Sequence, residues 1–349
     1  MRRMQPENIL IISPNWLGDA VMAMPAVQRF KKLHPASRLT VLAKPGVAPL
    51  WAMHEAVDQV VVLPGGTAAT FRMAARLRRQ GFSKAFILPN SFRSALIPFL
   101  ATIPTRRGTA FHGRWAMVDE RVRLPAADAQ GVPLHQAREY LILLCDAPDG
   151  DLADTGFHPP PPRPLDGLPP AEGPTIGVVP GAARGDAKRW TGFAEAVKIV
   201  LRDVPACRVV VAGAKNEMAL CSRVAEAIGP AAVSVAGRTS LPEFAALLGH
   251  CQLVLCNDSG GMHLASAAGV PVVAVYGLTD PDKTGPIGPG AVVVRAAGVR
   301  PSRDIARNSH AAIAALASIR PEEVARACVA QLEAMRSWTA SQTDRKPSP

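Results

Sequence analysis

The sequence has few aromatic residues, no closely spaced cysteine pair and no long apolar run, and each absence excludes a class of protein. Aromatic residues make up 5% of the 349 residues, too few to interleave with basic side chains as stacking platforms for nucleic acid. The six cysteines never fall at C-x-x-C spacing, which predicts buried thiols in a reducing compartment rather than zinc or disulfide motifs. No uncharged apolar stretch reaches about 18 residues, so the sequence predicts a cytoplasmic protein without a membrane span.

Acidic residues are scarce in the first half of the chain. Residues 1–150 contain 19 basic and 10 acidic side chains, whereas residues 151–349 contain 20 and 18. The basic surplus predicts that the N-terminal half meets an anion, which could be nucleic acid, an acidic membrane face or a phosphorylated substrate. The lack of stacking aromatics makes nucleic acid the weakest of these candidates, and we expect no nucleic-acid partner.

Short apolar runs alternate with helical patterns on both sides of a proline-rich stretch. This pattern predicts an α/β fold with two Rossmann-like, doubly wound parallel-sheet domains. We expect an N-terminal domain over residues 1–157, a linker over 158–174, a C-terminal domain over 175–320, a helix over 321–336 and a flexible tail over 337–349. Because ligands bind beyond the carboxyl ends of parallel strands, a central cleft between the domains is the expected site.

The expected elements follow from the apolar periodicity. Expected strands cover residues 8–13, 39–43, 59–63 and 84–88 in the first domain, and 175–179, 208–212, 233–236, 253–256 and 272–275 in the second. Expected helices cover residues 19–33, 68–80, 192–203, 218–228, 241–249 and 262–268.

Asp19 stands at the start of a predicted helix, just after the first strand. Two interpretations are open. The carboxylate could be the N-cap of the helix, bonded to free backbone N–H groups, or it could be a general base that takes a proton from an incoming hydroxyl. Gly18 alone does not make the G-x-G-x-x-G fingerprint, so we expect no dinucleotide cofactor here.

Two segments of the second domain could hold a phosphate. Small and basic residues from Gly181 to Lys188 could form a phosphate cradle or a solvated basic loop. The amides of Ser259, Gly260 and Gly261 lie at a predicted helix start, where the helix dipole favours an anion. The sequence leaves two further questions open, because Asp258 could cap the turn or accept hydrogen bonds from a sugar hydroxyl, and His263 could pack or contact a ligand.

These segments together resemble a known enzyme family. Four anchors occur in order: Pro14-Asn15-Trp16-Leu17-Gly18-Asp19, then Leu88 to Ala95, then Pro180-Gly181-Ala182 with Ala187-Lys188-Arg189-Trp190, and finally Asn257-Asp258-Ser259-Gly260 with His263. They are similar to the ADP-heptose:lipopolysaccharide heptosyltransferases, glycosyltransferase family 9, which have the two-domain GT-B fold. Residues 90–95 with Arg107-Gly108 are closest to the heptosyltransferase II branch.

The resemblance implies roles for individual residues. Asp19 would be the general base. Donor binding would fall on Gly181, Lys188, Asp258, Ser259, Gly260, Gly261 and His263, and acceptor binding on Asn15, Trp16, Asn90, Ser91, Arg93 and Arg107. Arg93 and Arg107 are preferred among the arginines of the first half, most of which we expect to be solvated. The pair Asp280 and Asp282 is interpreted as a turn, and no metal site and no cofactor are expected.

The implied activity is an inverting transfer of heptose from ADP-L-glycero-D-manno-heptose to the acidic inner core of lipopolysaccharide, by an enzyme peripherally associated with the cytoplasmic face of the inner membrane. Residues 299–319 contain no cysteine, whereas many heptosyltransferase II sequences carry one there. This difference leaves two alternatives open: a related GT-B glycosyltransferase that uses another nucleotide sugar or acceptor, or a non-catalytic module that binds nucleotides or glycans.

Overall fold

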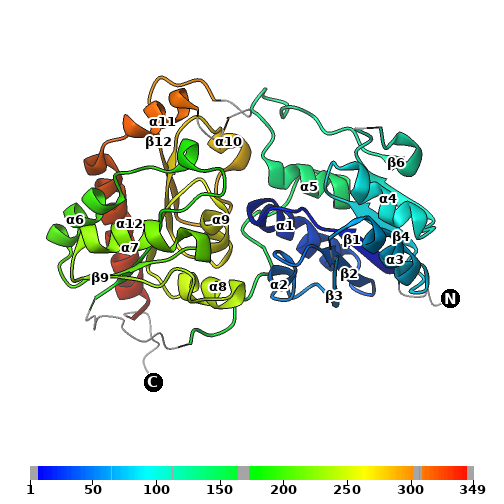
Figure 1. The fold of residues 1–349 in the computed structure, drawn as a ribbon, viewed down its shortest axis with the longest axis horizontal. Helices are drawn as coiled ribbons and strands as arrows, with labels where there is room; N and C mark the ends of the chain where they lie inside the picture. Colours follow the sequence, from blue (N-terminus) through cyan, green and yellow to red (C-terminus); the bar gives the residue numbers. More distant parts are fainter. Residues whose placement is uncertain are drawn as a thin grey trace. The chain divides into compact units, whose positions relative to one another are not determined.

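A computed structural model describes residues 7–63, 65–111, 113–163, 173–301, 306 and 309–343. The chain divides between His158 and Pro159 into two compact units. Unit 1 is drawn in blue to green-cyan and unit 2 in green to red in Figure 1. Among the described helices, none is both long and apolar enough to cross a membrane.

Unit 1 is built on a six-stranded parallel sheet. Its strands lie in the order β3, β2, β1, β4, β5, β6, with every neighbouring pair parallel. The bounds are β1 Asn8–Ile12, β2 Arg38–Ala43, β3 Gln59–Val62, β4 Lys84–Ile87, β5 Thr105–Gly108 and β6 Glu120–Arg121. Buried β-branched and aliphatic side chains dominate β1 and β2, as expected for strands covered on both faces.

The described residues of unit 1 form the helices α1 Leu17–Leu33, α2 Ala48–Trp51, α3 Thr67–Arg78, α4 Phe92–Leu100 and α5 Gln136–Cys145 around this sheet. Helix α1 packs against α5, and α3 packs against α4. Parallel crossovers are right-handed, so α1 covers one face of the sheet and the α3–α4 pair covers the other. The buried side of α3, from Ala69 to Leu77, packs with β1 and β4 side chains into one apolar core.

Unit 2 repeats the same topology. Its parallel strands lie in the order β12, β11, β10, β7, β8, β9. The bounds are β7 Thr175–Val179, β8 Arg208–Val211, β9 Ala232–Ser234, β10 Leu253–Asn257, β11 Val272–Tyr276 and β12 Ala291–Arg295. Read from the chain's own order, both sheets have the arrangement 3-2-1-4-5-6 of the doubly wound fold. The predicted fold class is thus confirmed for each unit.

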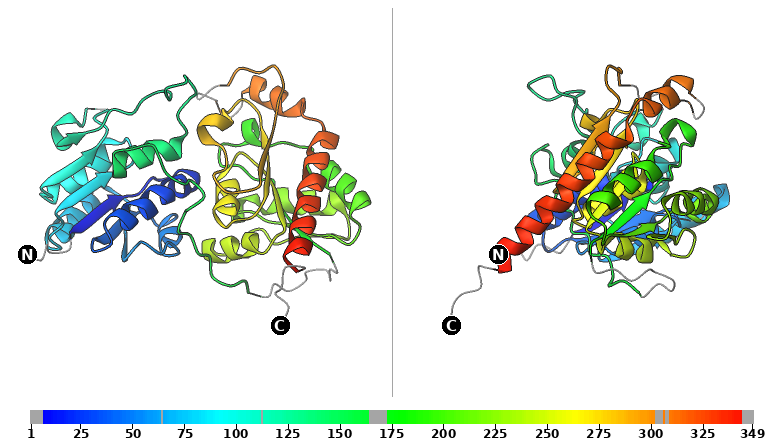
Figure 2. Two further views of the ribbon diagram at one scale, coloured as in Figure 1. Left: turned by 180° about the vertical axis from the view of Figure 1, so that it is seen from behind. Right: turned by 90° about the vertical axis from the view of Figure 1, so that its left-hand side faces the viewer.

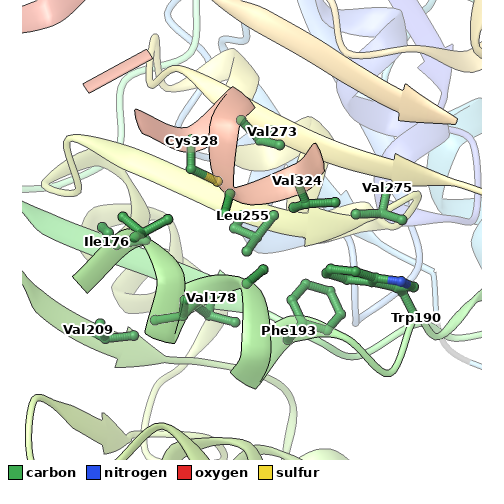
Figure 3. Close-up of a cluster of buried hydrophobic side chains, with 14 of the residues drawn as sticks. Ile176, Val178, Trp190, Phe193, Val209, Leu255, Val273, Val275, Val324 and Cys328 are labelled. Carbon is green, nitrogen blue, oxygen red and sulfur yellow. The ribbon is translucent and has the colours of Figure 1, made fainter. Parts of the chain in front are cut away.

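The helices of unit 2 enclose its core. They are α6 Phe193–Asp203, α7 Met218–Ile228, α8 Leu241–Gly249, α9 Gly260–Ala267, α10 Pro281–Thr284, α11 His310–Ala317 and α12 Pro321–Thr343, with 3-10 turns η2 Asp186–Lys188 and η3 Lys215–Glu217. Helix α12 lies along unit 2 and packs against α6 (Figure 2). Figure 3 shows the core beneath them, where Trp190 and Phe193 meet edge to face with ring centroids 5.2 Å apart.

The structure also corrects some expected bounds. Helix α12 continues to Thr343, beyond Arg336, where the sequence analysis placed its end. Helices α4, α5 and α11 and strands β5 and β12 were not among the expected elements. Residues 164–172 of the expected linker, six residues of the 299–319 segment and residues 344–349 of the expected tail lie outside the described residues. All six cysteines are free thiols, and five of them are buried, while Cys145 is half-buried.

A buried histidine anchors the end of unit 1. His54 is 3% exposed and its Nε2 lies 3.2 Å from the Met24 carbonyl oxygen, while its Nδ1 accepts the Ala56 N–H at 3.1 Å. The backbone of His54 bridges to Phe157, next to the unit boundary. Burial lowers the pKa of His54 to about 4. Because Nδ1 accepts a hydrogen bond, it carries no proton, and the imidazole ring is neutral in this environment.

Because His54 is neutral in the folded protein, we predict that the free energy of unfolding falls at acidic pH. The unfolded chain protonates this ring near pH 6.5 and the folded chain near pH 4, so the stability that it contributes is complete above pH 6.5 and is lost as the pH falls toward 4. We expect a loss of about 3 kcal/mol from this group, measured by urea unfolding across this range. The His54→Gln variant lacks the titration, so its stability deficit relative to wild type should shrink as the pH falls. A deficit that is constant with pH would contradict this account.

Candidate functional site

Each sheet has one point where the strand order reverses, between β1 and β4 in unit 1 and between β7 and β10 in unit 2. Ligands of doubly wound folds bind beyond the carboxyl ends of the strands at such points. Four loops follow these strands: the β1 loop (13–19), the β4 loop (88–93), the β7 loop (180–190) and the β10 loop (258–263). They are the four segments on which the sequence analysis placed nearly all its candidate residues.

A buried amide joins the two loops of unit 2. Asn257, the last residue of β10, is fully buried. Its Nδ2 donates to the Pro180 carbonyl oxygen at 2.8 Å, and its Oδ1 accepts the Trp190 backbone N–H at 3.0 Å. Both ends of the β7 loop are therefore tied to the start of the β10 loop. The sequence analysis included Asn257 in a motif but gave it no role, because its partners lie far away in the chain.

The same two loops bring Lys188 and Asp258 together. Lys188 ends the 3-10 turn η2 and forms an ion pair with the Asp258 carboxylate. The side chains are only 16% and 10% exposed, so the pair is largely withdrawn from water. The expectation of a solvated basic loop is wrong for Lys188, whose ammonium group points toward the β10 loop.

The amino end of α9 carries the features of an anion site. Its N-cap residue, Ser259, makes no side-chain capping bond, and the buried Ser259 Oγ has no hydrogen-bond partner within the described part of the chain. The first-turn amides of a helix point outward and carry the positive end of its dipole. Lys188 adds a cation beside them through its pair with Asp258. This arrangement can hold a phosphate or diphosphate group.

The glycines of this site allow close packing. A Cβ atom on Gly261 would lie 2.9 Å from Val179 Cγ1, so only glycine lets α9 approach the end of β7 this closely. A side chain on Gly181 would overlap the carboxylate of Glu217, and this carboxylate accepts the Ala214 N–H at 2.9 Å. His263 is buried on the first turns of α9. In the described residues, no group of three or more His, Cys, Asp and Glu side chains could hold a metal ion.

In unit 1, Asp19 is the third residue of α1 and is partly buried. The N-cap position belongs to Trp16, so the interpretation of Asp19 as the cap residue is wrong. Burial, followed by the negative charge of Asp19, raises the pKa of the buried Tyr140 on α5. Asp19 therefore lies within electrostatic range of a phenol that the sequence analysis did not single out. Asn15 and Trp16 precede it as exposed residues of the β1 loop.

The β4 loop is held by its own side chains. Asn90 Oδ1 accepts a hydrogen bond from Thr109 Oγ1 at 2.6 Å. Ser91 is the N-cap of α4, and its Oγ accepts the Ser94 N–H at 3.3 Å. Arg93 Nε donates to Thr70 Oγ1 at 2.9 Å, which connects the starts of α3 and α4. These residues follow β4, next to the β1 loop, since β1 and β4 are neighbouring strands.

Arg114, to which the sequence analysis gave no individual role, donates hydrogen bonds to this loop. It is fully buried, and its guanidinium donates to the Pro89 carbonyl oxygen, to Asn90 Oδ1 at 3.2 Å and to Thr109 Oγ1 at 2.6 Å. Burial lowers its pKa to about 10. The guanidinium of Arg114 thus donates to uncharged oxygen atoms, and its hydrogen bonds to Pro89 and Asn90 fix the conformation of the β4 loop.

Arg107 connects strand β5 to helix α5. It lies within β5, and its side chain is 12% exposed. Its Nε donates to the Leu143 carbonyl oxygen at 2.7 Å, and its guanidinium also contacts the Ile142 carbonyl oxygen, Glu120 and Asp146. These bonds tie β5 to the last turn of α5. The assignment of Arg107 to acceptor binding stays a prediction.

Comparison with known proteins identifies a common family. The model of glycosyltransferase family 9 (heptosyltransferase) matches residues 70–312. The lipooligosaccharide heptosyltransferase 2 of Haemophilus ducreyi is 32% identical to this chain, with 82% of this chain and 88% of the relative covered. The lipopolysaccharide heptosyltransferase 2 of Escherichia coli K12 is 31% identical, with 82% and 87% covered.

Solved structures agree with this assignment. The structure described as E. coli ADP-heptose lps heptosyltransferase II has a TM-score of 0.76 to this chain at 25% identity, and the match covers 94% of this chain and 99% of that one. E. coli heptosyltransferase WaaC with ADP has a TM-score of 0.68 at 22% identity, covering 83% and 94%, and shows that the fold is shared.

The Lys188–Asp258 pair predicts a strong energetic coupling. Removing one partner leaves the other charge buried, so Lys188→Met and Asp258→Asn should each lower the free energy of unfolding by roughly 3 kcal/mol. The double variant should lose clearly less than the sum, because no isolated charge remains. Urea unfolding measures each value. Arg163→Met, which removes an exposed ion pair with Glu243, is the control and should cost less than about 1 kcal/mol. Additive losses in the double variant would rule out this coupling.

Proposed function

Because this chain belongs to glycosyltransferase family 9, the heptosyltransferases, we propose that it transfers a heptose from ADP-L-glycero-D-manno-heptose to the inner core of lipopolysaccharide. The chain is a glycosyltransferase, and its most extensive curated similarities include enzymes named heptosyltransferase 2. The observation that carries the donor assignment is the uncapped start of α9 beside the buried cation of Lys188.

The donor diphosphate binds in unit 2 in this proposal. The amides of Ser259, Gly260 and Gly261 donate to phosphate oxygens, and the Ser259 hydroxyl supplies a further donor. Lys188 is held at the same place by Asp258. Negative charge grows on the diphosphate as the glycosidic bond breaks, so these groups stabilise the transition state more than the ground state. Asp258 and His263 complete the donor site, with Gly181 giving room for the β7 loop.

Asp19 is the general base of the proposed reaction. Its carboxylate takes the proton of an acceptor hydroxyl, and the resulting oxygen nucleophile forms a bond to the anomeric carbon of the heptose. The bond between that carbon and the phosphate oxygen breaks at the same time, and ADP leaves with the bonding electrons. Attack on the face opposite the leaving group inverts the anomeric centre.

The acceptor binds to unit 1 in this scheme. The inner core of lipopolysaccharide is acidic, and residues 1–150 carry a basic surplus. Asn15 and Trp16 are exposed beside Asp19, and Asn90, Ser91 and Arg93 form the neighbouring β4 loop. Arg114 supports this loop from within. Since this acceptor is a glycolipid, the protein works at the cytoplasmic face of the inner membrane as a peripheral protein.

A direct turnover assay tests the proposed function. The protein is incubated with ADP-heptose and defined truncated core acceptors, and mass spectrometry measures the glycosylated product and released ADP. We expect product with the mass of one added heptose. A panel of other nucleotide sugars, compared by protection against thermal unfolding, identifies a different donor if one binds more tightly. Saturable donor binding without ADP release in the presence of any core acceptor would show a binding module and would refute the proposal.

Removal of the Asp19 carboxylate should abolish most turnover. Asp19→Asn keeps the size of the side chain and loses the base, so we expect kcat to fall by roughly 10²- to 10⁴-fold while the KM for ADP-heptose changes little. Steady-state kinetics with the truncated acceptor measures both constants. The matched control is Asp149→Asn, an exposed carboxylate of unit 1, which should keep wild-type kinetics. Near-normal kcat in a folded Asp19→Asn enzyme would remove Asp19 from the base role.

A further inference from the structure

Two neighbouring helices of unit 1 expose large aromatic side chains. Phe71 on α3 is 56% exposed, and Phe92 and Phe99 on α4 are 52% and 41% exposed. The opposite sides of both helices are buried in the core of unit 1. Phenylalanine is among the residues most often buried in proteins, so three exposed ones on neighbouring helices are unusual, although the guanidinium of Arg106 covers part of Phe99 at 5.4 Å from the ring centroid.

The helices that carry these aromatic residues are neighbours in unit 1. Helix α3 packs against α4, as Figure 1 also shows. The hydrogen bond from Arg93 to Thr70 joins the residues next to Phe92 and Phe71 in the chain. Phe92, the half-buried Leu96 and Phe99 follow one another at helical spacing, so they form one stripe along α4. We call the surface made by Phe71, Arg72, Arg76, Phe92 and Phe99 the α3–α4 face.

The α3–α4 face lies in the most basic part of the chain. The 60 residues between Asp58 and Asp119 contain no Asp or Glu and nine Lys or Arg residues. Arg72 and Arg76 are both exposed on α3 and lie about one turn apart, and Arg72 follows Phe71 in the chain. Exposed aromatic rings next to arginines on one helix face are typical of helices that lie in a membrane interface, where the rings enter the headgroup region and the guanidinium groups meet lipid phosphates.

We propose that the α3–α4 face docks unit 1 on the surface of an anionic lipid bilayer. The inference rests on the proposed function, because a glycolipid acceptor has to be reached in its membrane. The positive charge of the α3–α4 face favours an anionic bilayer over a second copy of this chain. A second copy of this chain would bring two basic faces together without an acidic residue between them, since residues 59–118 have none, whereas anionic phospholipids complement this charge.

The amino ends of α3 and α4 place the proposed docking face near the β4 loop and Asp19. Helix α4 begins immediately after Ser91 of the β4 loop, and α3 begins where Arg93 reaches the Gly66 carbonyl oxygen. Both starts lie at the carboxyl edge of the unit 1 sheet, the same edge from which Asp19 follows β1. A bilayer on the α3–α4 face therefore presents its glycolipids close to the loops that the proposed function assigns to the acceptor.

Vesicle binding by the full chain tests this proposal. The protein is sedimented with vesicles of phosphatidylglycerol and phosphatidylethanolamine, and with vesicles of phosphatidylcholine alone. We expect binding to the anionic vesicles that weakens as salt rises. Arg72→Ser/Arg76→Ser should weaken it about 30-fold at low salt, from roughly fivefold for each arginine near an anionic surface. Phe71→Ser should weaken it roughly tenfold, and this loss should persist at high salt because it is apolar.

Matched controls come from unit 2. Arg202 is an exposed arginine of α6, and Met218 is a 47% exposed apolar residue of α7. Arg202→Ser and Met218→Ser should bind anionic vesicles like wild type. Circular dichroism shows that each variant is folded. Equal binding to anionic and neutral vesicles, or wild-type binding by the α3 variants, would overturn the proposal. Self-association that the α3 variants abolish, without vesicle binding by wild type, would also overturn it and would identify a second copy as the occupant.

A second readout separates this inference from the proposed function. With a truncated acceptor that has no acyl chains, the α3 variants should turn over ADP-heptose at the wild-type rate, because they change only membrane contact. With the acceptor embedded in anionic vesicles, their turnover should fall in parallel with vesicle binding. Absence of turnover by wild type with every acceptor refutes the proposed function, whereas wild-type turnover by the variants on vesicles refutes only the docking face.

Discussion

The buried amide of Asn257 is the interaction on which the chemistry of unit 2 depends. It binds one end of the β7 loop through the Pro180 carbonyl oxygen and the other through the Trp190 N–H. The backbone between these two points must then form a short loop over the end of β10, and this loop places Lys188 against Asp258. A fully buried amide whose two ends both find partners fixes one loop conformation, because every alternative leaves a polar atom unsatisfied.

The two units share one sheet topology but place groups of different charge at the point where the strand order reverses. Both sheets have the strand order 3-2-1-4-5-6, so both offer a site at the same reversal point. Unit 2 places a cation and uncapped helix amides there, which favour an anion. Unit 1 places the carboxylate of Asp19 on the first turn of α1 and buries the cation Arg114 beneath the neighbouring loop. The same sheet topology can thus present a carboxylate at one reversal point and an uncapped helix start at the other.

Apolar periodicity and helix-end signals in the sequence predicted many of the helices and strands, but few of the contacts between residues far apart in the chain. Strand β7 and helices α7 and α8 have the predicted bounds, because their apolar periodicity and end signals agree. Helix α4 was missed because it contains Pro98, a residue that disfavours helix interiors, and because its outer face is apolar. The roles of Arg107 and Arg114 depend on oxygens as distant as Leu143 and Pro89, and a single sequence shows no such pairing. The loops that carry Asp19 and Lys188 could be singled out in advance because they follow strand ends, whereas the roles predicted for the two residues rested on the family resemblance.

The left-handed backbone at Gly156 determines where the chain can be cut to produce unit 1 alone. Gly156 has a φ of 59°, and a side chain there would overlap the amide of Gln28. The next residues pair with the His54 backbone and bring His158 Nε2 within 2.9 Å of the Glu55 carboxylate, so this short return segment completes the surface of the first sheet domain. A gene fragment that stops before it would expose the pocket around His54 to water. An expression boundary for the isolated half therefore belongs after residue 158, within the run of prolines.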